Sequence, residues 1–392
     1  MWNLLGERGV DILSWENFGN EWTKDGVQEL KLDNLRTFTA PFGELPDLSQ
    51  IDFNNDVVFT WNGTSSGVMV PDRGAWIPAD RTGLTLVDAT SCIFGVDLPW
   101  DKLDAVSWSW QKVMGGEAAH GMLALSPRAV ERLNTFHPDR AIPKVFRLKK
   151  NGKINPEPFE GATLNTPSLL CVEDALDGLR WAEDIGGLPV LMGRVQSNFE
   201  ALSRWVERTS WIDFLATDPA VRSCTSVTLK VVDPAFDGLS EDDLRKTLRR
   251  IPQMCEAEGA GYDFSEHKSA PPGFRIWCGA TVETSDLEAL FPWIEWSFHQ
   301  IRAELAGGQG HRGDEHAVRQ FHHHGRTRYC HAAGPGPRHS PGQRLDPRRQ
   351  VGEIPLHGGR DHGQGTGHHR LRQYRIGRRR PGPGLEDAGH RL

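Results

Sequence analysis

The stretch AVSWSWQKVMGGEAAHG, residues Ala105–Gly121, decides the fold because it leads from a buried strand to a lysine. Its first part, Ala105–Trp110, alternates branched or aromatic residues with small ones, which is typical of a buried strand. The apolar run stops at Gln111 and Lys112, and a pair of glycines follows. We therefore expect Lys112 to lie at the end of a strand.

A second predicted strand supplies an acid. The apolar run Leu84–Val87 leads directly into Asp88. A lysine at a strand end is most often a solvated cation, but a deprotonated lysine amine can attack a carbonyl. An acid and a lysine at neighbouring strand ends indicate a pyridoxal phosphate site. There the lysine joins the cofactor covalently, and the carboxylate keeps the pyridine nitrogen protonated so that the ring accepts electrons.

The composition fits a cytoplasmic enzyme. The chain has 392 residues, enough for two domains, and its six cysteines show no spacing typical of a zinc site or a redox pair. No apolar run reaches the about 20 residues of a membrane span, and the N-terminus does not resemble a signal peptide. Residues 1–306 contain 29 Lys and Arg against 45 Asp and Glu, which argues against a nucleic-acid partner.

Four segments, which include the two strand ends described above, carry a resemblance to a known family. They are TWNGTSSG (Thr60–Gly67), VDATS (Val87–Ser91), SWQKVMGGEAAHGM (Ser109–Met122) and LNTPS (Leu164–Ser168). Together they resemble phosphoserine aminotransferase, a class V, fold-type I pyridoxal phosphate enzyme, in the form found in alphaproteobacteria. The resemblance runs in order over residues 1 to about 306.

The resemblance implies an α/β fold with a mostly parallel, doubly wound sheet whose site lies at the carboxyl edge. A large cofactor-binding domain is expected at residues 1–185. A smaller C-terminal α/β domain is expected at residues 186–306.

The same resemblance implies roles for five cofactor-binding residues. Lys112 would bind the cofactor and move protons as general acid and base, and Asp88 would stabilise the pyridinium. Trp22 would stack on the ring, although a tryptophan that simply packs in the core is the competing interpretation. Thr64 would hydrogen-bond the phenolic oxygen, or form only a turn. Gln111 would contact the cofactor phosphate.

A short loop is implied to act across subunits. Asn165 and Thr166 would reach the cofactor phosphate of the partner subunit, so that the site would be complete only in a homodimer. From the sequence alone, this loop is also predicted to cap a helix, with Pro167 at the first helical position. His120 is expected to pack near the site without a catalytic role.

The substrate contacts implied by the resemblance are basic. Arg275 would hold the substrate α-carboxylate in a planar bidentate fork. Lys268 would contact the substrate phosphate, and His267 is a second candidate for this contact. The competing interpretation is that Lys268 is an ordinary surface lysine with no role in binding.

The implied reaction moves an amino group between glutamate and 3-phosphohydroxypyruvate, giving O-phosphoserine and 2-oxoglutarate in serine synthesis. The related phosphohydroxythreonine of pyridoxine synthesis would be a further substrate. Two alternatives stay open at this point. One is another fold-type I enzyme such as a cysteine desulfurase or lyase, and the other is an inactive truncated homologue.

Both ends of the chain depart from the family pattern. Trp2–Leu5 with Gly6 is predicted to be the last turn of a helix, so the chain is expected to lack the N-terminal segment that carries the phosphate loop. Residues 307–392 contain 16 arginines, no lysine and no periodicity. Two interpretations of this composition are metal binding by His322–His324 and nucleic-acid binding by Arg378–Arg380. We favour a third interpretation, in which this tail is disordered because GC-rich DNA has been translated in the wrong reading frame.

Overall fold

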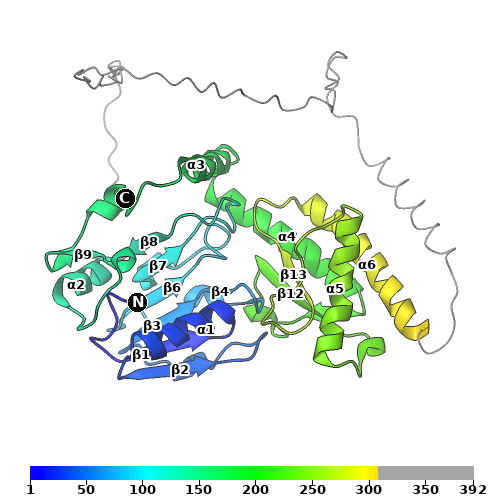
Figure 1. Ribbon diagram of the computed structural model, residues 1–392, viewed down its shortest axis with the longest axis horizontal. Coiled ribbons are helices and arrows are strands. Elements are labelled where there is room, and N and C mark those ends of the chain that lie inside the picture. Colours follow the sequence, from blue (N-terminus) through cyan, green and yellow to red (C-terminus); the bar gives the residue numbers. More distant parts are fainter. Residues whose placement is uncertain (308–392) are drawn as a thin grey trace, which may run out of the picture. The chain divides into compact units, whose positions relative to one another are not determined.

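The computed structural model describes residues 1–307, and a six-stranded sheet organises the first part of this stretch (Figure 1). Its spatial order is β2-β1-β3-β6-β7-β8, and all neighbours run parallel except β8, which is antiparallel to β7. The strands are β1 (Val10–Ser14), β2 (Leu35–Thr39), β3 (Asp56–Thr60), β6 (Thr85–Asp88), β7 (Ala105–Trp108) and β8 (Met122–Leu125). Because parallel strands end at one edge, the carboxyl ends of β1, β3, β6 and β7 lie together.

The central strands are buried on both faces, as expected for a doubly wound sheet. All five residues of β3 are buried, and its side chains alternate between two apolar clusters. Val57 and Phe59 belong to one cluster, whereas Val58 belongs to the other. This alternation follows from the two-residue period of a strand covered on both sides. Helices α1 (Asn17–Lys24) and α2 (Pro127–Thr135) belong to this part of the chain.

A three-stranded antiparallel sheet organises the second part of the described chain. It has the order β11-β12-β13, formed by Ile212–Phe214, Ser226–Val231 and Phe274–Trp277. Its core is completed by α4 (Leu188–Arg208), α5 (Glu241–Ala257) and α6 (Thr284–Gly307), which Figure 1 shows grouped around these strands. The residues described belong to one compact unit, and the division into domains at residue 185 stays a prediction.

A small hairpin joins the two sheets. It consists of β4 (Asn62–Gly63) and β5 (Val68–Met69). The Ser226 hydroxyl, at the start of β12, donates to the carbonyl of Thr64 at 2.6 Å. Gly67 has φ +70°, and an added Cβ there would lie 2.9 Å from the backbone nitrogen of Thr228. Glycine is therefore needed where the hairpin turns against the second sheet.

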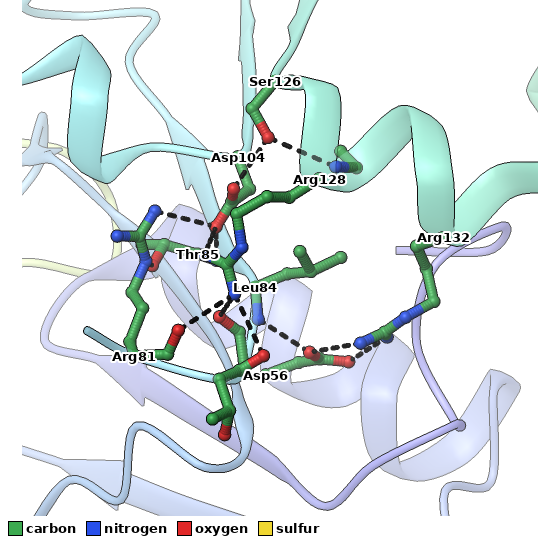
Figure 2. A network of polar contacts seen from close by, with 11 residues as sticks. Asp56, Arg81, Leu84, Thr85, Asp104, Ser126, Arg128 and Arg132 are labelled. Atoms are coloured by element: carbon green, nitrogen blue, oxygen red, sulfur yellow. Dashed lines mark hydrogen bonds and ion pairs between the residues drawn. The ribbon is translucent and has the colours of Figure 1, made fainter. Parts of the chain in front are cut away.

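Buried ion pairs lie at the opposite, amino edge of the six-stranded sheet (Figure 2). Asp56, the first residue of β3, accepts from Arg132 of α2 at 2.8 Å. Asp104, just before β7, accepts from Arg81 at 3.0 Å and from Arg128 at 3.1 Å. Because the Asp56 carboxylate is buried and paired with Arg132, removing this arginine would leave its charge without an ion-pair partner. This network ties α2 to the start of the strands.

Most predicted elements are confirmed, with differences at their ends. The strand expected at Ala105–Trp110 ends at Trp108, and the chain then turns back as the unpredicted β8. The prediction that Pro167 starts a helix is wrong. Helix α3 (Leu169–Asp184) begins two residues later, because the Ser168 hydroxyl accepts from the N–H of Cys171 and caps it. A further short hairpin, β9 (Lys149–Lys150) and β10 (Lys153–Ile154), precedes α3.

Some predictions fall outside the described residues. The tail at 308–392, including His322–His324 and Arg378–Arg380, is among them. Within residues 1–307, five cysteines are free thiols, and no cluster of histidine, cysteine and acidic side chains could hold a metal ion. None of the helices in this part of the chain has the length and apolar character to cross a membrane.

Candidate active site

The carboxyl edge of the six-stranded sheet aligns three polar residues in one row. Thr60 ends β3 and pairs in register with Asp88, which ends β6. Asp88 in turn pairs with Ser107 of β7. Residues in register on parallel neighbours point to the same face of the sheet. Thr60, Asp88 and Ser107 therefore form the floor of a polar site at this edge.

The Asp88 carboxylate is held by the residue that follows the strand end. The backbone N–H of Thr90 donates to Oδ1 at 2.8 Å, and the Thr90 hydroxyl donates to the same oxygen at 2.6 Å. Because both hydrogen bonds go to Oδ1, Oδ2 can accept a hydrogen bond from a ligand. Burial raises the pKa of Asp88, while the two bonds from Thr90 lower it.

Lys112 lies in the turn that follows β7. The N–H of Gly115, which has φ +72°, donates to the Lys112 carbonyl at 3.0 Å and closes this turn. Burial lowers the pKa of the Lys112 amine, and the positive charge of Arg275 lowers it further, whereas Asp263 raises it. A lowered pKa increases the fraction of free amine, which is the form that attacks carbonyls and accepts protons.

Strand β13 and the loop before it contribute an aromatic ring and a cluster of basic side chains. The Nζ of Lys112 lies 5.8 Å from the ring centroid of Trp277, which follows Arg275 by two residues on β13. The pKa of His267 is lowered by burial and by the charges of Arg275 and Lys268. The imidazole of His267 therefore lies near two cations, Arg275 and Lys268, and the lowered pKa favours its neutral form. Such a cluster suits a small ligand with two anionic groups.

Several polar atoms near the carboxyl edge are buried without a partner in the described residues. Because buried polar groups nearly always form hydrogen bonds, such a concentration indicates a polar ligand. The atoms are Ser14 Oγ, Thr60 Oγ1, Asn62 Oδ1, Ser109 Oγ and Gln111 Oε1. Ser14 and Thr60 end β1 and β3, and the others lie within three residues of the ends of β3 and β7. With the acid Asp88 and the amine Lys112, this donor set fits pyridoxal phosphate.

Two aromatic residues of α1, Trp22 and Phe18, lie in different surroundings. Trp22, predicted to stack on the cofactor, packs against the apolar cluster that contains Ile12 and Val58. Phe18, one turn earlier and just after β1, is 41% exposed, and its ring lies 6.0 Å from the ring of His267. Phe18 therefore lies beside the predicted substrate-binding residues, and sequence analysis missed it.

Thr64 is buried in the hairpin between β4 and β5, with its carbonyl bonded to Ser226. The buried carboxylate of Glu16 lies close by and accepts from the Ser65 hydroxyl at 2.8 Å and from the N–H of Gly19 at 2.7 Å. It caps the start of α1 and thereby fixes the segment that carries Phe18.

Two predicted cofactor residues are not brought to this edge within one chain. Asn165 and Thr166 are exposed in the loop before α3. Apolar side chains around them are also exposed, with Leu169 73% and Leu170 75% accessible. His120, given no role, packs with its ring 5.4 Å from that of Trp110.

The remaining missed residues had weak signals in the sequence. Ser14 and Thr60 could have been found from their positions at strand ends. Trp277 could have been found from its spacing of two from Arg275, which puts both side chains on one face of a strand.

No protein-family profile matches the chain. The chain is 51% identical over 302 residues to the phosphoserine aminotransferase of Methanosarcina mazei, covering 77% of this chain and 79% of that protein. It is 50% identical to the enzyme of the same name from Methanosarcina barkeri, with the same coverage. Among solved structures, a phosphoserine aminotransferase from Cytophaga hutchinsonii matches with a TM-score of 0.60 and 18% identity, covering 75% of this chain and 78% of that one. This structural likeness supports the fold.

Proposed function

Because the chain belongs to the phosphoserine aminotransferase family, we propose that it transfers an amino group between glutamate and 3-phosphohydroxypyruvate, giving O-phosphoserine and 2-oxoglutarate. We include the related phosphohydroxythreonine among its substrates. One observation carries the proposal. The amine of Lys112, whose pKa burial lowers, lies 5.8 Å from the ring of Trp277 on the strand that carries Arg275, and the half-buried acid Asp88 ends the strand beside β7.

The residues that would hold the cofactor lie at or near the carboxyl edge of the six-stranded sheet. Pyridoxal phosphate, when bound, supplies an electron sink that stabilises negative charge at the substrate α-carbon. Asp88 would hold the proton of the pyridine nitrogen through Oδ2. Thr64 would bind the phenolic oxygen, and Gln111 would donate to the phosphate from its side-chain amide N–H. Phe18 competes with Trp22 as the aromatic side chain that covers the ring.

Lys112 has two tasks in this proposal. Its amine binds the cofactor at rest, and after substrate displaces it, the free amine removes the proton from the substrate α-carbon. A general base works best when its pKa lies near the working pH. The burial and the positive neighbour that lower the pKa of Lys112 support this second task.

The basic side chains of the second part of the chain would bind the two anionic groups of the substrate, its α-carboxylate and its phosphate. Arg275 offers a planar fork that matches the α-carboxylate shared by phosphoserine and glutamate. Lys268 and His267 would contact the phosphate, which only phosphoserine carries. This division of labour predicts different effects on the two amino donors.

We also propose that the enzyme works as a homodimer in the cytoplasm. The exposed apolar side chains of Leu164, Leu169 and Leu170 are suited to burial against a second copy. Asn165 and Thr166 of the partner subunit would then reach the cofactor phosphate. The free thiols among the described residues support a reducing compartment.

The direct experiment is a donor comparison with the purified chain loaded with pyridoxal phosphate. Phosphoserine and 2-oxoglutarate should give glutamate, whereas alanine and cysteine should be poor donors. Release of sulfide from cysteine without turnover of phosphoserine would identify a desulfurase instead. Bound cofactor without turnover of any donor would indicate an inactive homologue.

A further inference from the structure

The contact between Lys112 and Trp277 joins the two sheets at the reactive amine. The ammonium nitrogen lies 5.8 Å from the indole centroid, within the distance at which a ring face attracts a cation. Among the described residues, the charged groups that act most on Lys112 are Arg275, which repels the ammonium, and Asp263, which attracts it. Asp263 is exposed, so that water screens its attraction.

The indole ring is held in place by two sets of contacts. Trp277 packs against the apolar cluster that includes Val113 and Met114, the two residues that follow Lys112. The ring also lies against Gly279, where an added Cβ would come within 2.4 Å of the indole nitrogen. The ring therefore has little freedom to move, and it braces the turn that carries the lysine.

We propose that Trp277 is a positioning residue for Lys112, holding the ammonium over its indole face whenever the amine is not joined to the cofactor. This inference rests on the proposed function, in which the same amine is first released and then used as a base. Without the ring, repulsion from Arg275 would drive the charged side chain away from the edge. With it, the amine stays within the site between its two tasks.

A cation held by a ring face makes a definite electrostatic prediction. The ring stabilises the protonated amine, so that weakening the ring's negative face should lower the pKa of Lys112 further. At a fixed pH below that pKa, the amine should react about two- to fivefold faster with a small acylating reagent, as expected for a moderate cation–π contact. A purely structural role predicts either no change or, if water enters, a higher pKa.

The experiment measures the acetylation rate of Lys112 in the cofactor-free chain by mass spectrometry across a pH series. Fluorinated tryptophan, incorporated in growing cells, weakens the ring face without changing its shape. Lys112 should then react faster in the wild-type chain but not in Trp277→Phe, which carries no tryptophan at this position. Equal effects of fluorination in both chains would overturn the proposal.

Substitution of the tryptophan provides a second, independent test of the proposal. Trp277→Leu keeps the site apolar and should accelerate acetylation of Lys112, while Trp181→Leu, a tryptophan of the same cluster, should not. A slower reaction in Trp277→Leu would contradict the proposal. If that variant does not fold, the fluorination series decides. Since neither measurement uses cofactor or substrate, their failure is distinct from failure of the donor comparison above.

Discussion

Thr60 and Asp88 are paired in register at the carboxyl ends of two neighbouring parallel strands, β3 and β6. The hydroxyl of Thr60 is buried without a partner in the described residues, and both hydrogen bonds to the Asp88 carboxylate go to Oδ1 rather than Oδ2. A strand edge with two such groups, close to an amine of lowered pKa, is built to receive a polar molecule.

The first prediction concerns the acid of this pair. Asp88→Asn keeps an oxygen that can accept both bonds from Thr90, so the local structure should persist. The amide cannot hold the proton of the pyridine nitrogen, and kcat should fall about a hundredfold or more. Cofactor binding, measured by absorbance titration, should change much less. A variant with unchanged kcat would remove Asp88 from the mechanism.

The second prediction separates the two anion-binding tasks. Arg275→Gln should raise KM for phosphoserine and for glutamate by about ten- to a hundredfold, because each α-carboxylate loses a charge-assisted pair. Lys268→Ala should raise KM for phosphoserine alone. Steady-state kinetics with each amino donor provides the comparison. An equal effect of Lys268→Ala on both donors would contradict phosphate recognition by this lysine.

The third prediction decides which aromatic residue covers the cofactor. Phe18→Leu should weaken cofactor binding by about two- to tenfold, the range expected for one aromatic stacking contact. Trp22→Leu should instead reduce thermal stability, since Trp22 packs against the apolar cluster containing Ile12. Equilibrium titration of both variants with pyridoxal phosphate makes the test. The reverse order of effects would support Trp22 as the side chain that stacks on the cofactor.

These two aromatic residues illustrate how far the sequence could be interpreted. The apolar runs before Asp88 and Lys112 predicted the two strands that lead to these residues, although β7 ends at Trp108. Phe18 and Trp22 are one helical turn apart, and only packing reveals which of them lies under the sheet. Trp277 reaches Lys112 only because the second sheet docks on the β4–β5 hairpin, a long-range relationship that no local pattern records.

The fourth prediction concerns stability and pH. Burial raises the pKa of Glu16 above that of the unfolded chain, despite hydrogen bonds from Gly19 and Ser65 that lower it. The folded state therefore carries an unfavourable charge above the folded pKa, and this cost disappears as the pH falls through that pKa. Glu16→Gln should be more stable than the wild type at neutral pH, and the difference should shrink in acid.

Thermal unfolding of the cofactor-free chain across a pH series tests this sign. Glu157→Gln is the matched control, because Lys150 and Asn155 lower the pKa of the Glu157 carboxyl and its substitution should not stabilise the protein. A Glu16→Gln curve that lies below the wild type at neutral pH would show that the charge is needed to cap α1.

The most direct test of the whole account is to identify the lysine that holds the cofactor. Borohydride treatment of the loaded enzyme, followed by digestion and mass spectrometry, fixes the cofactor to its lysine for identification. The account predicts one modified peptide, carrying the label on Lys112, and no label in Lys112→Ala. A label on another lysine, or an unchanged cofactor spectrum in Lys112→Ala, would contradict it.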